Sequence, residues 1–354
     1  MYKVDTIMNI AIALAQKAES KTLPNPRVGA VIFDDKGKIL GKGWHKAFGK
    51  AHAEVDAINN TVKNSNTTKN KNMCVTLEPC NHFGKTPPCT DAIIKAGIKN
   101  VYVGTTDDCK TVCGEGIRKL KLAGIKVKVG ILEKECRALN PGFHKYNAKK
   151  RPFIRIKVAI SMNEMMGSTW FTSKAAREKV LKTRKNSDLV LTGVGTIKKD
   201  NPTFHSRRNL AILDQNLSLY EQYLKRSLNI FKLKGNIIIV TSDNKNLKSK
   251  IKALESKNIQ IISTKLNKKG LIDLNILLKR LGSEFNYREI MVEAGPSVVK
   301  SLVIEAVKLV DKIDIYIAPV WLKEQNTLPK LPKLVVETQE MLENTLALEA
   351  HFDI

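Results

Sequence analysis

Strand-like and helix-like segments alternate along most of this sequence, and this alternation constrains the fold more than any other feature. "MCVTLEP" (73–79) has the pattern of a buried strand, "CTDAIIKAGI" (89–98) that of a helix closed by a glycine, and "KNVYVGTTD" (99–107) that of the next strand. The same order recurs in "GIRKLKLAGIKVKVG" (116–130). Helices that alternate with strands are typical of α/β sandwiches, and we predict one here.

The segments ahead of residue 73 extend this pattern. Residues 28–45 have the pattern of a β-hairpin, and His52–Ile58 that of a second helix. "IMNIAIALAQKAES" (7–20) is interrupted by Asn9 and precedes no cleavage site, so we interpret it as a packed helix and not as a signal peptide. No run reaches the roughly 18 apolar residues that a membrane span needs. With 43% hydrophobic and 27% charged residues, we expect a soluble cytoplasmic protein with no membrane partner.

A break in the alternation suggests two domains. The segment "NPGFHKYNAKKRPF" (140–153) is rich in proline, glycine and basic residues, and 354 residues are too many for one ordinary core. We therefore expect one domain over residues 1–147 and another over 151–354. The second resumes the alternation with strand 153–161, a helix and strand 188–196, which predicts another α/β sheet of nucleotide-binding type.

The formal net charge of +26 admits three interpretations. Lysines can bind nucleic acid, they can steer phosphorylated substrates toward a cleft, or they can reflect a biased composition. Arginine is sparse, no basic cluster is interleaved with aromatic residues, and Lys and Asn recur even in plain stretches such as residues 61–72. We favour biased composition and do not expect a nucleic-acid partner.

A histidine, a glutamate and two cysteines have the pattern of a zinc site. His52 and Glu54 lie at a predicted helix start, Cys80 follows a strand that ends at Pro79, and Cys89 begins the next helix. Helix-start amides are expected to lower the pKa of the Cys89 thiol. One imidazole and two thiolates leave the fourth tetrahedral position of zinc open for water, and zinc lowers the pKa of that water. Glu54 can then relay protons during attack on an amidine-type C–NH2 carbon.

The spacing around this pattern is specific, with one departure. An H-x-E triplet alone arises by chance in many helices, but H-x-E with P-C-x-x-C is the zinc deaminase signature. Here eight residues, "NHFGKTPP" (81–88), separate the cysteines, and this insert offers side chains suited to a phosphate. The other thiols are interpreted as incidental (Cys109, Cys113) or as small apolar core residues (Cys74, Cys136).

Four segments carry a close resemblance to a known family: "LPNPRVGAV" (23–31), "GWHKAFGKAHAE" (43–54), "TLEPCNHFGKTPPCTDAI" (76–93) and "DDCKTVCGEGIRKLKLAGIKVKVG" (107–130). In this order they resemble the deaminase half of the bifunctional riboflavin biosynthesis deaminase/reductase. The resemblance implies a cytidine-deaminase-like α/β/α sandwich, zinc ligands His52, Cys80 and Cys89, and Glu54 as acid and base. It also implies substrate contacts at Asn25, His45, His82, Lys85 and Thr86. From the sequence alone, Asn25 is equally well explained as a turn residue between prolines.

The rest of the chain resembles the reductase half of the same family. The resemblance lies in residues 151–161, 170–204 and 292–303, and it implies a dihydrofolate-reductase-like α/β domain that uses NADPH. "VGT" after a strand and "EAGPS" opening a helix suit a dinucleotide. The catalytic residues implied are Lys157 and Asp200. The substrate contacts implied are Ser168, Arg184, Phe204, Arg207 and Glu293. The cofactor contacts implied are Ala159, Trp170, Thr196, Asp200, Ser242, Gly295, Pro296 and Ser297. Arg184 can equally be a solvated helix residue.

Two departures from the family pattern concern the reductase half. Asn163 replaces an aspartate, Glu164 replaces a glycine, and several residues are missing before Trp170. Ala294 stands where a glycine is common. A shortened loop without the carboxylate is expected to weaken or abolish reduction.

Three functions follow from these observations. The leading hypothesis is a homo-oligomeric zinc and NADPH enzyme that deaminates 2,5-diamino-6-ribosylamino-4(3H)-pyrimidinone 5′-phosphate and then reduces its ribosyl group to ribityl. The second is a deaminase alone, with the C-terminal half as scaffold or dimer surface. The third is an RNA-binding or tRNA-modifying deaminase. The "GKTPPC" segment (84–89) and the reductase-like second half argue against the third.

Overall fold

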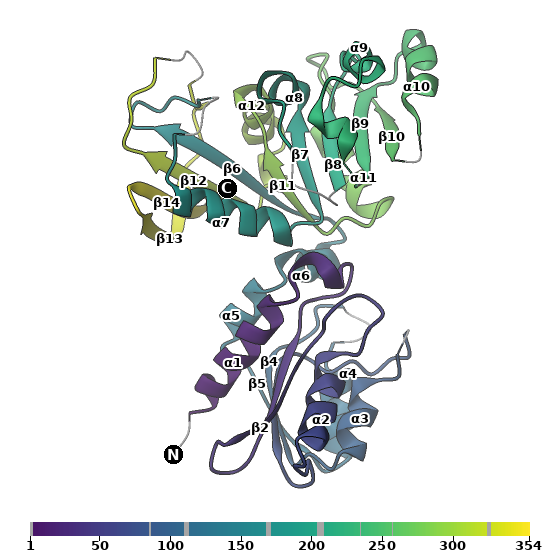
Figure 1. Cartoon of the computed structure of the whole chain (residues 1–354), viewed down its shortest axis with the longest axis vertical. Coiled ribbons are helices and arrows are strands. Elements are labelled where there is room, and N and C mark those ends of the chain that lie inside the picture. Colours follow the sequence, from purple (N-terminus) through teal and green to yellow (C-terminus); the bar gives the residue numbers. More distant parts are fainter. Residues whose placement is uncertain are drawn as a thin grey trace. The chain divides into compact units, whose positions relative to one another are not determined.

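The computed structural model describes residues 3–84, 86–109, 113–167, 171–203, 209–233, 235–256, 258–323 and 327–354. The chain divides into two compact units, Met1–Lys150 and Arg151–Ile354, and each has its own sheet (Figure 1). No helix within the described ranges has the length and apolar character that a membrane span requires.

The first unit is built on a sheet whose described strands have the order β2-β1-β3-β4-β5. The strands are β1 (Gly29–Phe33), β2 (Ile39–Trp44), β3 (Asn72–Leu77), β4 (Asn100–Thr105) and β5 (Lys126–Val129). The helices are α1 (Val4–Gln16), α2 (Ala53–Lys63), α3 (Cys89–Lys95), α4 (Glu115–Leu122), α5 (Glu133–Ala138) and α6 (Pro141–Lys149), with a 3-10 turn at Glu19–Thr22. β1 and β2 form the hairpin expected at residues 28–45, whereas β3, β4 and β5 run parallel.

Helices cover both faces of this sheet, so the first unit is a three-layer sandwich. α1 and α5 lie on one face, and α2, α3 and α4 lie on the other (Figure 1). The five residues of β1 are all buried and alternate between the two cores. Ala30 and Ile32 pack with α2 and α3, while Val31 and Phe33 pack with α1. A strand buried on both faces gives the continuous apolar run seen in the sequence.

A glycine on β2 lets α2 lie directly on the sheet. A Cβ atom on Gly43 would stand 2.2 Å from the backbone nitrogen of Ala57 on α2, so no larger residue fits there. This close approach fixes the helix whose N-terminus carries His52 and Glu54.

The second unit is built on a larger sheet, in which the described strands have the order β10-β9-β8-β7-β11-β6-β12-β14-β13. The strands are β6 (Phe153–Ser161), β7 (Leu189–Gly193), β8 (Asn209–Leu213), β9 (Ile237–Ser242), β10 (Ile259–Thr264), β11 (Glu289–Glu293), β12 (Lys312–Ala318), β13 (Leu334–Leu342) and β14 (Thr345–Phe352). The helices are α7 (Lys174–Asn186), α8 (Val194–Asp200), α9 (Tyr220–Leu224), α10 (Lys248–Leu254), α11 (Leu274–Ser283) and α12 (Pro296–Glu305), with 3-10 turns at Asn229–Lys232, Lys245–Leu247 and Val307–Leu309.

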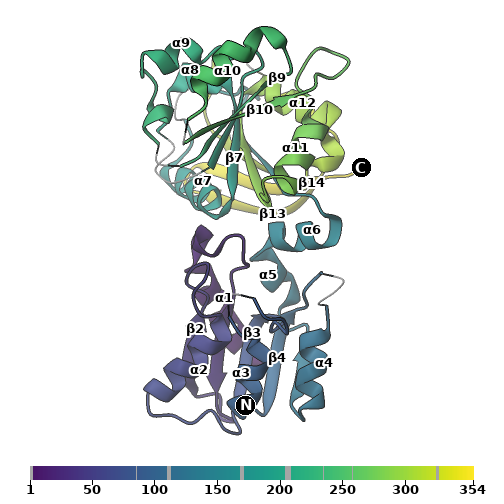
Figure 2. The same cartoon turned by 90° about the vertical axis from the view of Figure 1, so that its right-hand side faces the viewer.

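Strands β10 through β12 are parallel, and β14 and β13 extend the sheet as an antiparallel hairpin. α11 and α12 lie on one face, and α7, α8 and α10 lie on the other (Figure 2). Because β7 and β11 are parallel neighbours, α8 and α12 begin at the same edge of the sheet. The strand expected at residues 188–196 is shorter than predicted, since β7 ends at Gly193 and "VGT" forms the first turn of α8.

Candidate active sites

The first candidate site is a cluster of three side chains, two at the starts of helices and one just after the end of a strand. His52 is the residue before α2, Cys80 follows β3 after two intervening residues, and Cys89 begins α3. Their ligand atoms all lie within 4.8 Å of one another. His52 Nδ1 stands 3.2 Å from Cys89 Sγ and 3.5 Å from Cys80 Sγ. Donors about 2.0–2.3 Å from one ion at tetrahedral angles lie roughly 3.3–3.8 Å apart, so this trio fits zinc.

Hydrogen bonds within the cluster separate the acidities of the two thiols. Cys80 Sγ accepts hydrogen bonds from the Cys89 thiol and from the Cys89 backbone N–H, which lies 3.3 Å away. These bonds, together with His52, lower the pKa of Cys80 to about 4, although burial acts to raise it. The pKa of Cys89 is raised, because its proton is held by Cys80 and because it is buried. The helix-start amide that we expected to act on the Cys89 thiol instead donates to Cys80 Sγ, so the pKa that it lowers is that of Cys80. The thiol with the lowered pKa is Cys80, which accepts these bonds, and a low thiol pKa favours metal ligation.

Glu54 lies beside this cluster without belonging to it. It occupies the first turn of α2, only 3% of its surface is exposed, and it hydrogen-bonds with Cys89. Burial, assisted by the nearby Cys80, raises the pKa of Glu54 to about 7. A carboxyl group that titrates near neutrality can both accept and release a proton at physiological pH.

Two of the predicted substrate contacts border the cluster. His45 is buried, its ring packs edge-on against His52 with 5.2 Å between centroids, and burial lowers its pKa. Because Nδ1 of neutral His45 donates to the Ala51 carbonyl at 3.0 Å, its Nε2 is left as an acceptor. Asn25 Nδ2 lies 3.5 Å from that Nε2. Asn25 is thus more than a turn residue, since its side chain reaches the cluster's neighbour.

The insert between the cysteines is only partly tied to the site. His82 is exposed and Thr86 is half-buried, and within the described residues neither side chain forms a hydrogen bond. Lys85 lies outside the described residues. Asn81, which sequence reasoning missed, accepts a bond from the Thr90 hydroxyl at 3.1 Å and so attaches the start of the insert to α3.

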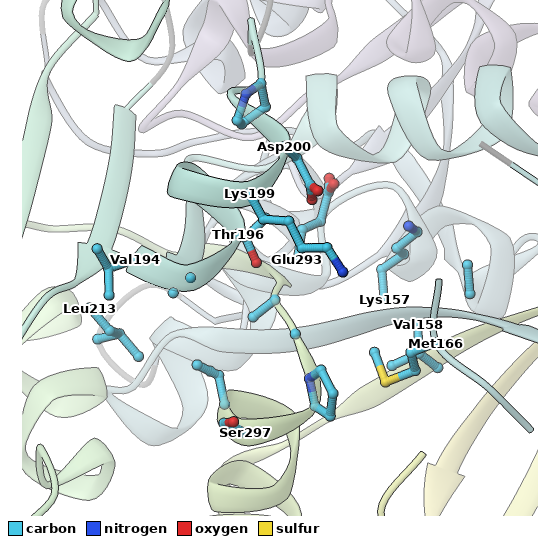
Figure 3. Close-up of a pocket in the computed structure, with 18 of the residues that line it drawn as sticks. Lys157, Val158, Met166, Val194, Thr196, Lys199, Asp200, Leu213, Glu293 and Ser297 are labelled. Carbon is cyan, nitrogen blue, oxygen red and sulfur yellow. The ribbon is translucent and has the colours of Figure 1, made fainter. Parts of the chain in front are cut away.

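The second candidate site is a cavity of about 1360 Å³ in the second unit (Figure 3). The predicted residues that line it are Lys157, Ala159, Arg184, Thr196, Asp200, Glu293, Gly295, Pro296 and Ser297. Ser242 does not line it, because this residue is buried behind Gln215, whose carbonyl accepts its hydroxyl at 2.9 Å. Ser168, Trp170, Phe204 and Arg207 lie outside the described residues.

Three charged side chains meet on the α7 side of this cavity. Lys157 on β6 and Glu293 on β11 are register partners in the parallel sheet. Arg184 of α7 donates to both carboxylate oxygens of Glu293, with Nε–Oε1 and Nη2–Oε2 distances of 2.7 and 2.6 Å. Burial, reinforced by the charge of Arg184 against the opposing charge of Glu293, lowers the pKa of Lys157. Arg184 is therefore a member of the cavity wall and not a solvated helix residue.

Two helix starts supply a second kind of group to this cavity. Thr196 and Ser297 belong to the first turns of α8 and α12 (Figure 3). A Cβ atom on Gly295 would lie 3.9 Å from Thr196 Oγ1, so the two turns are close neighbours. Backbone N–H groups at the start of a helix bind anions such as a dinucleotide's phosphates.

Sequence reasoning missed several cations of the cavity wall. These are Lys174, Arg177 and Lys199. Lys174, Arg177 and Arg184 recur at intervals of three and seven residues, which places them on one face of α7. That spacing is visible in the sequence and is the signal that would have identified them.

The shortened loop keeps its turn despite the two substitutions. Glu164 has a φ of 58°, the left-handed conformation that usually favours glycine. Asn163 Nδ2 donates to the Leu322 carbonyl at 2.8 Å, and its Oδ1 accepts the Leu322 N–H at 3.1 Å. A carboxylate could not make both bonds, because it has no N–H to donate to the Leu322 carbonyl. The two bonds hold the segment whose Met166 and Gly167 line the cavity. Ala294 also lines the cavity.

Comparisons with known proteins match both halves of the chain. The family model described as the cytidine and deoxycytidylate deaminase zinc-binding region matches residues 1–105, and that of the RibD C-terminal domain matches residues 152–347. The riboflavin biosynthesis protein RibD of Aquifex aeolicus is 38% identical over 324 residues, which are 88% of this chain and 86% of its own.

Of two further relatives, one matches only the first unit and the other matches nearly the whole chain. A diaminohydroxyphosphoribosylamino-pyrimidine deaminase of Buchnera aphidicola subsp. Schizaphis graminum is 49% identical over 138 residues, 39% of this chain and 91% of its own. The crystal structure of a Thermotoga maritima diaminohydroxyphosphoribosylaminopyrimidine deaminase/5-amino-6-(5-phosphoribosylamino)uracil reductase has a TM-score of 0.84, 30% identity and 98% coverage of both chains. The predicted fold class, an α/β deaminase followed by an α/β reductase, is confirmed. The chain belongs to the RibD family, the bifunctional deaminase/reductases of riboflavin biosynthesis.

Proposed function

We propose that the first unit deaminates 2,5-diamino-6-ribosylamino-4(3H)-pyrimidinone 5′-phosphate and that the second reduces the ribosyl group of the product to ribityl with NADPH. The name of the Thermotoga structure, a deaminase/reductase, supports this pair of activities, and the name of the Aquifex relative supports a role in riboflavin biosynthesis. The observation that carries the proposal is the convergence of His52, Cys80 and Cys89 beside the buried carboxyl group of Glu54.

In the first unit, the residues would divide the work of hydrolysis. His52, Cys80 and Cys89 would hold a zinc ion, which when bound lowers the pKa of a coordinated water toward neutrality. Glu54 would take a proton from the attacking water and deliver it to the departing ammonia, which its pKa near 7 permits. Asn25 and the acceptor Nε2 of His45 would contact polar groups of the pyrimidine.

In the second unit, the residues would position an opened ribose for reduction. NADPH, when bound, supplies a hydride to the ribose carbon that is reduced. The first turn of α12 would bind phosphate oxygens of the cofactor. Lys157, whose pKa burial lowers, would supply the proton that completes the reduction, and Arg184 with Glu293 would keep it in place.

The experiment that tests this proposal offers the purified protein the diaminopyrimidine ribosyl phosphate with and without NADPH. Mass spectrometry would show an amino group exchanged for oxygen in both cases. Only with NADPH would the product gain two hydrogens while the near-ultraviolet absorbance of the reduced cofactor falls. Exchange of the amino group without cofactor oxidation would reject the second activity and favour a deaminase alone. No mass change at all would reject the proposal.

A further inference from the structure

Glu78 is a buried carboxylate that the proposed chemistry does not use. Only 6% of its surface is exposed. It lies between β3 and Cys80, and its backbone N–H donates to the Thr105 carbonyl at 2.8 Å. Its two oxygens accept four backbone N–H groups, all from the segment after β4, at 3.2 Å from Asp107, 3.1 Å from Gly114, 3.0 Å from Gly116 and 3.4 Å from Ile117.

Three of these bonds, those from Gly114, Gly116 and Ile117, give helix α4 a cap from a distant part of the chain. α4 begins after Gly114, which has a φ of 79° and no side chain that can cap the helix. The first N–H groups of a helix have no partner within it and attract negative charge. Glu78, 38 residues before Gly116, satisfies them instead.

The start of α4 also packs closely against Pro79, the residue that precedes Cys80. A Cβ atom on Gly116 would stand 2.1 Å from the carbonyl oxygen of Pro79. Gly116 has no positive φ, so its role lies in this close approach and not in backbone freedom. Glu78 and Pro79 are thus held from the α4 side by four hydrogen bonds and by direct packing.

We infer that Glu78 is a positioning residue that sets where the Cys80 sulfur stands in the metal cluster, acting through its bonds to α4. Cys80 is two residues further along the chain, and its sulfur must stay within 3.5 Å of His52 Nδ1 and 3.3 Å of the Cys89 N–H. If the four bonds are lost, the end of β3 is free to shift, and a shift of the Cys80 sulfur moves one donor of the trio. This inference rests on the proposed zinc-dependent function.

The test measures zinc affinity of the full-length protein by competition with a chromophoric chelator, and it compares two variants. Glu78→Gln keeps the shape but turns an NH2 group toward two of the four backbone donors, which repels them. Gly116→Ala keeps the carboxylate and forces Pro79 away from α4. Each variant should bind zinc roughly 10–100-fold more weakly, as is typical when groups that support a ligand are lost. The visible absorption spectrum of the cobalt-substituted protein, which reports ligand geometry, should also change in both.

Asn140→Ala is the matched control, because it breaks partly buried side-chain hydrogen bonds of the first unit that involve no member of the cluster. Asn140 donates to the Arg27 carbonyl and accepts the Arg27 N–H, both at 2.8 Å. This variant should unfold at a lower temperature yet keep the zinc affinity and the cobalt spectrum. Wild-type affinity in either Glu78→Gln or Gly116→Ala, or equal weakening in Asn140→Ala, would overturn the inference while leaving the deaminase intact. A wild-type protein that binds no zinc would overturn the proposed function as well.

Discussion

Arg184 on α7 and Glu293 at the end of β11 form a two-pronged ion pair, with both nitrogen–oxygen distances below 2.8 Å. Lys157 on β6 is the register partner of Glu293. The positive charge of Arg184 helps to lower the pKa of Lys157, whereas the negative charge of Glu293 opposes this effect. The pKa of Lys157 is therefore lowered by burial first and then adjusted by two charged neighbours, one from α7 and one from β11.

Replacing Arg184 with methionine should raise the pKa of Lys157, because one positive neighbour is removed and Glu293 is freed. If Lys157 supplies a proton, reduction declines as the pH rises through its pKa, so this limb of the pH–rate profile should move to higher pH. The rate at neutral pH should fall roughly 10- to 100-fold from the loss of alignment. Deamination by the same polypeptide is the internal control. An unshifted reductase profile would contradict this role for Arg184.

Changing Glu54 to glutamine should lower deamination at least ~100-fold, since the amide cannot carry a proton between water and ammonia. Zinc content should stay at the wild-type level, because Glu54 is not among the clustered ligands. Asp56→Asn is a suitable control, as this carboxylate lies in the same helix turn but pairs with Lys46 at 2.9 Å. Steady-state rates and metal analysis of both variants decide the matter. Normal turnover in Glu54→Gln would remove this residue from its role.

Changing Cys89 to serine should deplete zinc from the purified protein and destabilise the first unit, because metal binding contributes to folding stability. With free zinc about 100- to 1,000-fold above the dissociation constant, the lost stabilisation would be roughly 3–4 kcal/mol. The exposed thiol of Cys113 supplies the control. Elemental analysis and thermal unfolding of Cys89→Ser and Cys113→Ser should differ accordingly. Equal zinc content in the two variants would contradict the assignment of Cys89.

The sequence predicted the metal cluster well, because each of its members lies at the end of an element. His52, Cys80 and Cys89 follow directly from where a helix begins or a strand ends, and a local pattern suffices to locate such points. The pKa values of the two thiols were not predictable in this way. They depend on which sulfur accepts the other's hydrogen bond, and this is decided by the three-dimensional arrangement.

The second unit was less predictable, for two physical reasons. Arg184 and Glu293 are 109 residues apart, so their pairing leaves no local signal. The hairpin of β13 and β14 was missed because β13 is exposed along nearly its whole length, and a strand without a buried face lacks apolar alternation. The two bonds between the Asn163 amide and Leu322 were also not predictable, because the partners are 159 residues apart; whether the loop weakens the reductase stays a prediction.

Changing Glu164 to glycine should stabilise the second unit by about 0.5–1 kcal/mol. Its exposed side chain is held at a φ of 58°, a conformation that costs a non-glycine residue energy. The neighbouring exposed Met162, which lacks a positive φ, should instead lose stability when changed to glycine. Chemical denaturation of both variants provides the comparison. A destabilised Glu164→Gly protein would show that the side chain has another role.

The contribution of His144 on α6 to the stability of the first unit should decline below about pH 6.5. Its Nδ1 lies 2.9 Å from Asp108, which also pairs with Arg137, whereas its buried Nε2 has no hydrogen-bond partner within the described residues. Burial, with help from the charge of Arg137, lowers the pKa of His144 below 6.5, despite the opposing charges of Asp108 and Asp107.

Because His144 then binds fewer protons in the folded protein than in the unfolded chain, its contribution to the free energy of unfolding must decrease as the pH falls from 6.5 toward the lowered value. His144→Gln lacks this titration, so the difference in unfolding free energy between wild type and variant should shrink along that range and be constant above it. Urea unfolding of the first unit at closely spaced pH values measures this difference. Curves that stay parallel from pH 7.5 to 5 would show that His144 is protonated equally easily in both states, and that its burial against Arg137 has no energetic consequence.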